Sequence, residues 1–266
     1  MSTPADLRAQ LHATLDLAIT FSNGLFNRVV VLDEAASTQD EARARHQGKA
    51  GLVVAAIRQT AGRGTRGRTW ADTGEKGLAI TFVLQTSRRS QGAVSLAAGV
   101  AAAFASTIAA GEGPHRASIG IKWPNDIVAE QGGRLRKLGG VLIEAHDKVL
   151  LVGIGLNVLQ VAADFPPELR ESAISLCQLQ SRTPVNKVAG RLTWSLAHGV
   201  SRDDADLVAF WKKLDKLTGR TARFMHDFAV YEGVVEHIDP LVEIHLRTAK
   251  GAAVRLPARS TSLVKD

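Results

Sequence analysis

The chain has 266 residues, and its composition of 45% hydrophobic and 22% charged residues excludes a disordered protein and predicts one large domain with at most a small second one. A single cysteine, Cys177, excludes an intrachain disulfide and a cysteine-based zinc cluster, and is typical of a reducing cytosol. We see no apolar run that approaches the roughly 18 residues of a membrane-spanning helix and no signal peptide, so we expect a cytoplasmic protein without membrane contact.

Basic residues outnumber acidic ones by 33 to 26, which gives a formal net charge of +7. This balance predicts an anionic partner, either a nucleic acid or a small phosphate. The densest basic cluster lies in residues 62–68 (GRGTRGR), where arginines alternate with small residues. Because clustered arginines on a flexible backbone suit one small anion better than a duplex, we favour the phosphate.

The first half of the chain alternates helical and strand patterns. Apolar residues at helical spacing predict an amphipathic helix over residues 4–22. Further helices are expected at 37–45, which opens with a Ser-Thr cap, and at 93–110, which is rich in small residues. Apolar runs predict strands at 28–32, 52–57, 78–84, 119–123, 141–144, 149–153 and 154–158. The close spacing of the last three indicates antiparallel hairpins, so we predict an α+β fold with a mixed sheet.

The second half of the chain has a different pattern. A Pro166-Pro167 loop precedes helices that we predict at 186–200 and 204–217. Short alternating strands follow, at 222–224, 231–238, 241–247, 253–256 and 261–264. Strands of this length and spacing predict a β-barrel of about 50 residues. We therefore place a domain boundary between residues 217 and 218.

Several familiar signatures are missing from the sequence. There is no G-x-x-x-x-G-K-[ST] phosphate loop and no G-x-S-x-G nucleophile elbow. The 8 histidines have no metal-ligand spacing, so we expect no metal site built from His or Cys.

Four other segments place polar side chains beside glycines or at strand ends. They are QTAGRGTRGRTW at 59–70, KWPND at 122–126, RKLGGVLIE at 136–144 and GIGLN at 153–157. Glycines let the backbone approach a ligand closely, and Arg and Lys donate to phosphate or carboxylate oxygens. Taken singly, each segment has a structural alternative: a solvated basic loop, a Pro-Asn-Asp turn, a surface lysine beside a hairpin, and a β-bulge.

Together the four segments closely resemble the motifs of the biotin protein ligases: G-R-G-x-x-G-R-x-W, K-W-P-N-D, K-L-x-G-[IV]-L-[IV]-E and G-[IA]-G-[IL]-N, in the same order and spacing. Ser37-Thr38-Gln39 is similar to the S-T-N segment at that family's biotin pocket. The resemblance covers residues 30–180, and the β-rich tail is similar to the family's SH3-like domain. It implies a biotin/lipoate ligase-like catalytic domain over residues 1–217 and an SH3-like β-barrel over residues 218–266.

The resemblance implies a ligase that uses ATP and Mg²⁺ in two steps. Biotin first becomes biotinyl-5′-AMP with release of pyrophosphate, and a lysine of a biotin carboxyl carrier domain then takes the biotinyl group and releases AMP. Lys137 and Arg63 are expected to stabilise charge at the α-phosphate, and Asp126 to orient and deprotonate the incoming amine. The loop at 160–167 is expected to close over the adenylate and exclude water.

The same resemblance implies the binding residues. Contacts with biotin are expected from Ser37, Thr38, Gln39, Gln59, Gly62, Arg63, Gly64, Thr65, Lys137, Gly140, Gly153 and Gly155. Contacts with ATP are expected from Arg63, Arg66, Arg68, Trp70, Lys122, Asn125, Asp126, Lys137 and Asn157. Mg²⁺ is expected to arrive with ATP.

Three departures and three alternatives accompany this prediction. Gln39 replaces the usual Asn, and Thr65 stands where Arg is common. Upstream of residue 30 there is no room for the winged-helix domain of repressor-type members, so we expect no nucleic-acid partner.

The alternatives are a lipoate or octanoate transferase, a non-catalytic biotin or adenylate sensor, and a nucleic-acid binder. The sequence leaves the oligomeric state open, a homodimer included.

Overall fold

A computed structural model describes residues 3–71, 74–86, 90–111 and 118–264, with the side chain of Arg66 outside the described part. Five α-helices are present in these ranges: α1 (Pro4–Thr20), α2 (Thr38–Arg45), α3 (Gln91–Ala109), α4 (Val185–Gly199) and α5 (Asp204–Leu214). Side-chain oxygens at the N-caps begin four of them, since Thr3, Ser37, Ser90 and Asp203 each accept from a backbone N–H of the first turn. All five helices were predicted from the sequence, with ends that differ by a few residues.

The main sheet has seven strands in the order β1-β2-β5-β9-β8-β7-β6. Their bounds are β1 (Arg28–Ala35), β2 (Leu52–Gln59), β5 (Gly77–Gln85), β6 (Ile119–Lys122), β7 (Asp126–Gln131), β8 (Arg134–His146) and β9 (Val149–Asn157). The β1–β2 pair is parallel and every other pair is antiparallel, so the predicted mixed sheet is confirmed.

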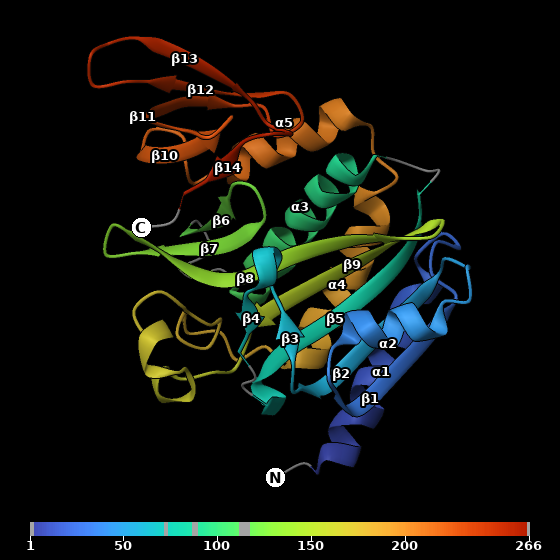
Figure 1. Ribbon diagram of the computed structural model, residues 1–266. Helices are drawn as coiled ribbons and strands as arrows, with labels where there is room; N and C mark the ends of the chain where they lie inside the picture. The colour runs from blue at the N-terminus through green and yellow to red at the C-terminus, as the bar shows by residue number, and fades with distance from the viewer. Residues whose placement is uncertain (1–2, 72–73, 87–89, 112–117, 265–266) are drawn as a thin grey trace.

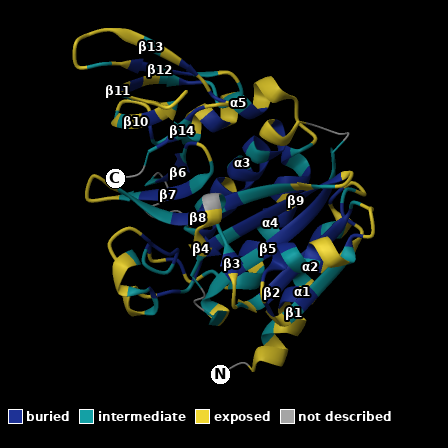
Figure 2. Cartoon of the chain, in the orientation of Figure 1, coloured by how far each residue is buried: buried dark blue, intermediate teal, exposed yellow. Residues whose placement is uncertain are grey.

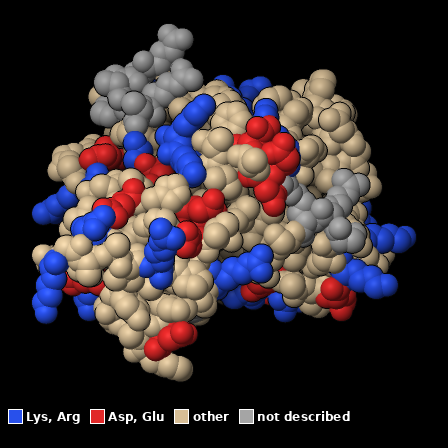
Figure 3. All heavy atoms as spheres, turned by 90° about the horizontal axis from the view of Figure 1, so that it is seen from above, with Lys and Arg blue, Asp and Glu red and all other residues tan. Residues whose placement is uncertain are grey.

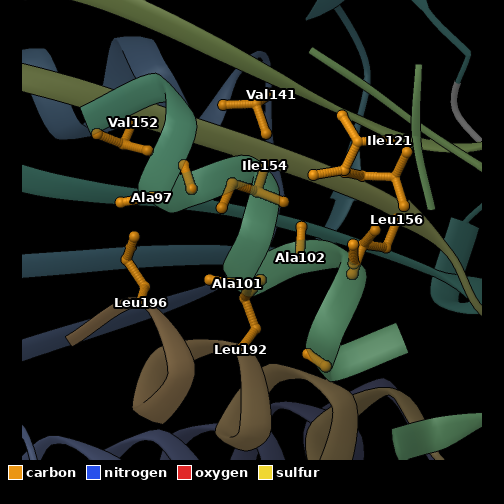
Figure 4. Close-up of a cluster of buried hydrophobic side chains, with 14 of the residues drawn as sticks. Ala97, Ala101, Ala102, Ile121, Val141, Val152, Ile154, Leu156, Leu192 and Leu196 are labelled. Carbon is orange, nitrogen blue, oxygen red and sulfur yellow. The ribbon is translucent and has the colours of Figure 1, made fainter. Parts of the chain in front are cut away.

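Helices cover both faces of this sheet (Figure 1). On one face the small residues Ala97, Ala101 and Ala102 let α3 lie close to the strands, with Ile154 of β9 on one side and Leu192 of α4 on the other (Figure 4). The opposite face is covered by the short helix α2 through a smaller apolar cluster around Ala42. The dark-blue strands and α3 in Figure 2 mark this core, while the hairpin ends of the C-terminal sheet are exposed. The core therefore fixes the strands on which the candidate site is built.

A second, five-stranded sheet forms the C-terminal part, in the order β13-β12-β11-β10-β14. Its strands are β10 (Thr221–His226), β11 (Ala229–Ile238), β12 (Glu243–Arg247), β13 (Ala253–Pro257) and β14 (Ser262–Leu263). The rings of Phe224 and Trp123, 5.9 Å apart between centroids, pack the second sheet against the turn after β6. A small C-terminal β unit is thus present, and its likeness to an SH3 domain stays a prediction, as does the boundary at 217/218.

Two strand predictions were wrong. The residues predicted as strands 149–153 and 154–158 form one strand, β9, because its glycines are accommodated inside a continuous antiparallel ladder with β5 and β8. The sequence also failed to predict β7 and the first half of β8, whose charged residues hide the strand pattern.

The expectation of no membrane-length apolar segment also needs correction. Helix α3 has 19 residues and a mean hydropathy of 1.7 over its most apolar window, so it is long and apolar enough to span a membrane by length and composition. Two thirds of that window, 67%, is buried inside the protein. Its apolar character is explained by its contacts with the sheet and α4, as for the core helix of a globular protein.

Candidate functional site

A cavity opens on the face of the main sheet that carries α2, below the glycine-rich loop formed by residues 62–68. Two short strands, β3 (Gly62–Arg63) and β4 (Thr69–Trp70), with a 3₁₀ turn at Thr65–Gly67 between them, make up this loop and lie in front of the sheet (Figure 1). The cavity is lined by Ser37, Thr38, Gln39, Gln59, Arg63, Gly64, Thr65, Trp70, Ala79, Asn125, Asp126, Lys137, Gly140, Val141, Leu142, Gly153, Ile154 and Gly155. Segments far apart in the chain therefore meet in one place.

One end of this cavity is polar and uncharged. Gln59 Oε1 accepts from the backbone N–H of Thr38 at 2.8 Å and from its hydroxyl at 3.1 Å, while Thr81 donates to the same hydroxyl at 2.9 Å. Ser37 caps α2 by accepting from the N–H of Gln39. These bonds fix the side chains and leave the amide nitrogen of Gln59 turned toward Gly62.

Gln39 has an unsatisfied acceptor at this end. Its side chain is 4% exposed and its Nε2 donates to the carbonyl of Leu142 at 3.0 Å. Within the described residues its Oε1 has no hydrogen-bond partner. Because leaving a buried acceptor unpaired costs about 1–3 kcal/mol, this oxygen favours a ligand that brings an N–H or O–H group.

Glycines make room for these side chains. A Cβ on Gly153 would lie 2.7 Å from Gln39 Nε2, and one on Gly155 would lie 2.7 Å from the indole of Trp70. The Trp70 ring therefore rests on β9, and a ligand that reaches Gly155 has to displace it.

The other end of the cavity is charged. Lys137 Nζ lies 2.6 Å from Asp126 Oδ1, 5.6 Å from the centroid of the Trp70 ring and close above Gly140. A β-bulge explains this placement: Ile127 pairs with Gly139 and Val128 with Lys137, so an extra residue separates the two pairs. Without the bulge, residues 137 and 140 would face opposite sides of the sheet.

Arg63 points away from this charged end. Its Nη1 lies 2.7 Å from both oxygens of Asp40 on α2, and its Nη2 lies 3.2 Å from Glu144 on β8. The hydrogen bonds that Arg63 donates to Asp40, together with the charges of both carboxylates, raise the pKa of Arg63 against a smaller effect of burial. The sequence-based contact between Arg63 and a phosphate therefore stays a prediction.

A second hollow of about 560 Å³ adjoins the charged end. Lys122, Arg68 and Asn157 line it together with Phe165 and Leu169 of the following loop. This loop contains two 3₁₀ turns, Ala162–Asp164 and Pro167–Leu169, and an ion pair of 2.5 Å joins Lys76 to Asp164. The Lys76 ammonium, as a hydrogen-bond donor, lowers the pKa of Asp164. A basic hollow with apolar and aromatic walls suits a nucleotide.

Asn157 has a structural role in this hollow. Its Nδ2 donates to the carbonyl of Lys137 at 3.3 Å and to that of Ile174 at 3.0 Å. The backbone of Lys137 also bonds to Ser172 and Ile174. Asn157 thus joins the loop to the strand that carries Lys137.

Nearly all of the sequence-predicted site residues come together. The central cavity or its neighbour is lined by every one of them except Gly62, which is buried beneath Trp70, and Arg66, whose side chain lies outside the described part. The sequence did not single out Ala79, Ile154, Leu142, Phe165 or Leu169, whose apolar side chains carry no chemical signature. It also missed Asp40, whose importance depends on a contact with a residue 23 positions away.

A group of metal-ligand side chains lies outside the cavity, at the end of α2: His46, His146 and Asp147. Gly48 donates its N–H to His46 Nδ1 at 2.8 Å, so the neutral ring carries its proton on Nε2, which lies 2.9 Å from His146 Nδ1. Both ring nitrogens of His46 thus take part in hydrogen bonds within this group, and Asp147 Oδ2 lies 3.4 Å from His146 Nδ1.

Charge on the surface is mixed. On the face seen from above in Figure 3, Lys and Arg side chains are interspersed with Asp and Glu rather than gathered into one patch. Among the described side chains of this face there is no continuous basic stripe of the kind that is typical of a duplex-binding surface.

Comparison with known proteins identifies relatives for half of the chain. Residues 31–159 match the model of the Biotin/lipoate A/B protein ligase family. The biotin--[acetyl-CoA-carboxylase] ligase of Mycobacterium tuberculosis is 37% identical over 146 residues, which are 53% of this chain and 51% of the relative. The bifunctional ligase/repressor BirA of Bacillus spizizenii is 34% identical over 157 residues, 56% of this chain and 46% of the relative. The chain thus spans about half the length of the curated relatives it matches.

Solved structures resemble a larger part of the chain. The biotin protein ligase from Aquifex aeolicus, in complex with biotin and ATP, superposes with a TM-score of 0.72 at 24% identity and covers 91% of this chain and 100% of its own. The enzyme from Leishmania major, in complex with biotinyl-5-AMP, has a TM-score of 0.60 at 24% identity and covers 87% of this chain and 99% of its own. These likenesses show a shared fold.

Proposed function

Since residues 31–159 carry a domain of the biotin/lipoate A/B protein ligase family, we propose that this chain is an ATP-dependent ligase that activates biotin as biotinyl-5′-AMP and transfers it to a lysine of a biotin carboxyl carrier domain. The proposal agrees with the proteins that this chain resembles, which include a biotin--[acetyl-CoA-carboxylase] ligase and a biotin protein ligase in complex with biotin and ATP. The four sequence motifs that suggested it line one connected site.

One observation carries the proposal: a single cavity joins a neutral polar end at Gln39 and Gln59 to a charged end at Lys137 and Asp126. Biotin has the same division, with an uncharged ureido group at one end and a carboxylate at the other. The unpaired Gln39 Oε1 would accept from a ureido N–H, and the amide nitrogen of Gln59 would donate to the ureido oxygen.

In the first step, a biotin carboxylate oxygen attacks the α-phosphorus of ATP and pyrophosphate leaves. Both reactants are anionic, so a fixed ammonium between them lowers the barrier. Lys137 fits this role because its Nζ stands between the two hollows, over Gly140. Lys122 and Arg68 would hold the phosphates from the second hollow, and Trp70 and Phe165 would form its apolar walls.

In the second step, the acceptor amine attacks the acyl carbon, AMP leaves with the electron pair of the broken C–O bond, and the amine gives up a proton. Asp126 is a suitable acceptor for that proton, since it lines both hollows and has a side chain only 15% exposed. Lys137 Nζ, 2.6 Å from Asp126 Oδ1, would hold this carboxylate in place until the amine arrives.

The nucleotide hollow also fits Mg²⁺. Among the described residues that line it, Asp126 is the one that carries a carboxylate. Mg²⁺ usually keeps several waters and binds one or two carboxylates together with substrate phosphates. An ion that arrives with ATP would therefore need only the carboxylate of Asp126 as a protein ligand. Such an ion would neutralise phosphate charge.

The test is direct. The chain is incubated with biotin, MgATP and a biotin carboxyl carrier domain, and pyrophosphate release and the mass of the carrier are followed. We expect both pyrophosphate release and one added biotinyl group. A protein that released no pyrophosphate and left the carrier unmodified would refute the proposal.

Lipoate and octanoate serve as competitors in the same assay. Their apolar ends would leave Gln39 Oε1 unpaired, at a cost of about 1–3 kcal/mol, so we expect biotin to be preferred. A preference for lipoate would identify the alternative transferase. An SH3-like C-terminal domain and a cytoplasmic location also belong to this proposal, and both rest on the sequence.

A further inference from the structure

Four charged side chains from three elements meet beside the central cavity. Arg63 of β3 contacts Asp40 on α2 and Glu144 on β8, and Arg43 Nη2 lies 2.9 Å from the same Glu144 oxygen. Two cations and two anions balance one another in this group. We call Asp40, Arg43, Arg63 and Glu144 the arginine clasp.

The arginine clasp matters for the glycine-rich loop because the strand pairing within that loop is very short. Strands β3 and β4 form a separate two-stranded sheet with only two paired positions, Gly62 with Trp70 and Arg63 with Thr69. So short a hairpin is marginal in water unless other elements hold it. The Arg63 guanidinium attaches the hairpin to two other elements, because Nη1 donates to Asp40 on α2 and Nη2 donates to Glu144 on β8 of the main sheet.

We infer that Asp40 and Glu144 are positioning residues for the glycine-rich loop: through Arg63 they hold Gly62 and Gly64 over the small-molecule cavity before a ligand enters. Neither carboxylate lines the cavity, so neither touches the ligand itself. The inference rests on the proposed function only where it names biotin as that ligand.

The clasp also changes the role expected of Arg63. Its charge is met by two protein carboxylates, because Nη1 donates to both oxygens of Asp40 at 2.7 Å while Nη2 lies 3.2 Å from Glu144. A planar guanidinium can present separate N–H groups to two carboxylates in this way. A loop that is already ordered loses less conformational freedom when a ligand binds. The clasp should therefore act on affinity for biotin rather than on the chemical step.

The test neutralises each carboxylate without changing its shape, in Asp40→Asn and Glu144→Gln. Glu41→Gln is the matched control, because Glu41 follows Asp40 on α2 but pairs with Arg45 instead. Biotin affinity is measured by calorimetry without ATP, and kcat and the KM for biotin by pyrophosphate release. We expect the biotin Kd and KM to rise about 3- to 10-fold in each clasp variant, with kcat and the Glu41→Gln control within about 2-fold of the parent protein.

Arg63→Gln separates the clasp from a phosphate contact. We expect it to raise the biotin Kd, and to add little when Asp40→Asn and Glu144→Gln are already present, since the three residues act as one unit. Unchanged biotin affinity in both carboxylate variants would overturn the inference. So would an Arg63→Gln enzyme that loses kcat about 100-fold at an unchanged biotin Kd, because this is the result for a phosphate-binding arginine.

A ligand-free readout keeps the inference distinct from the proposed function. Hydrogen exchange of the amides in residues 62–70 should be faster in the two clasp variants than in the parent protein or Glu41→Gln. Unchanged exchange would refute the clasp whatever the protein binds. Faster exchange in a protein that binds no biotin would leave the clasp standing and refute the ligase.

Discussion

Lys137 and Asp126 hold each other 2.6 Å apart at the charged end of the cavity, so each is oriented before any substrate arrives. Their exposed fractions differ, 35% for the lysine side chain and 15% for the aspartate. The ammonium can therefore turn toward an entering anion, while the carboxylate stays where an amine would need a proton acceptor. One ion pair thus serves both proposed steps.

Replacement of Lys137 by Ala tests this arrangement. We expect Lys137→Ala to reduce adenylate formation by about 10²–10³, the usual effect of removing a charge-stabilising donor. The fold should be unaffected, because the lysine side chain is partly exposed and lies in a cavity. Pyrophosphate release is the assay and Lys212→Ala, on the exposed side of α5, is the control. Release within a few fold of the parent rate would show that Lys137 has another role.

Thr65 allows a second test at the residue scale, because it lines both the central cavity and the second hollow. The family resemblance places Arg at this position, and Thr offers a hydroxyl without a fixed charge. We expect Thr65→Arg to hold biotinyl-adenylate more tightly by about 1–2 kcal/mol, the contribution of one charge-assisted hydrogen bond. The dissociation rate of the adenylate is the measurement, with Thr218→Arg as a distant control. An unchanged or faster rate would mean that another group already supplies this contact.

The sequence singled out most of the residues that line the two hollows, but it did not predict which side chains they contact. Lys137 was singled out because it stands in the segment Lys137-Leu138-Gly139-Gly140, which resembles the K-L-x-G motif of the biotin protein ligases. Its contact with Asp126 could not be predicted, since it depends on the bulge between Ile127 and Val128. Contacts across more than a hundred positions, such as that from Gln39 to Leu142, depend on the packing of α2 on the sheet and leave no local pattern.

At the scale of elements, a row of polar contacts joins α2 to β8. Gln39 donates to the carbonyl of Leu142, Arg43 pairs with Glu144, and His46 bonds to His146. The spacing follows from geometry, because residues three and four apart share one face of a helix and alternate residues share one face of a strand. The helix that begins at the polar end of the cavity is therefore held along its whole length.

The histidine pair at the end of this row predicts a pH effect on stability. Burial, followed by the neighbouring His146, lowers the pKa of His46 below its ordinary value of 6.5, and Asp147 opposes this weakly. The unfolded chain therefore binds the proton more readily, so the stabilisation is complete above pH 6.5 and is lost as the pH falls toward the folded pKa. We expect Tm to fall between pH 7.5 and 5.5, and to fall less in His46→Gln. Equal slopes for the two proteins would contradict this.

The glycines of β9 give a prediction of their own. In Gly153→Ala the new methyl would lie 2.7 Å from Gln39 Nε2 and push that side chain off the Leu142 carbonyl. We expect biotin affinity to fall about 10-fold, in line with the loss of one or two buried hydrogen bonds. Gly99→Ala on α3 is the control, because its methyl would meet Ile121 Cδ1 at an ordinary 3.7 Å. Biotin calorimetry and thermal unfolding together distinguish a local effect from loss of the fold.

For the whole molecule, the sequence predicted the arrangement of helices and sheets better than the ends of the strands. The change from long helices to short alternating strands near residue 219 corresponds to the second sheet, which begins at Thr221. Strand β7 was missed because its sequence, DIVAEQ, begins and ends with polar residues that reflect the site and the solvent rather than the sheet. The shape of the two hollows could not be predicted, because they arise where the glycine-rich loop, β8 and the loop after β9 meet.

The net charge of +7 leads to the last prediction. Carrier domains of the resembled family tend to be acidic, and opposite charges raise the rate of association more than the affinity. Such steering weakens once the screening length falls to about 8–10 Å at 0.1–0.15 M salt. We therefore expect the second-step kcat/KM for an acidic carrier to fall about 10-fold or more as salt rises from low to physiological strength and beyond. Transfer of biotin to a small neutral amine is the control, because it should respond weakly to salt. A flat response for the carrier, or tight binding of random duplex DNA at physiological salt, would assign the positive charge to another partner.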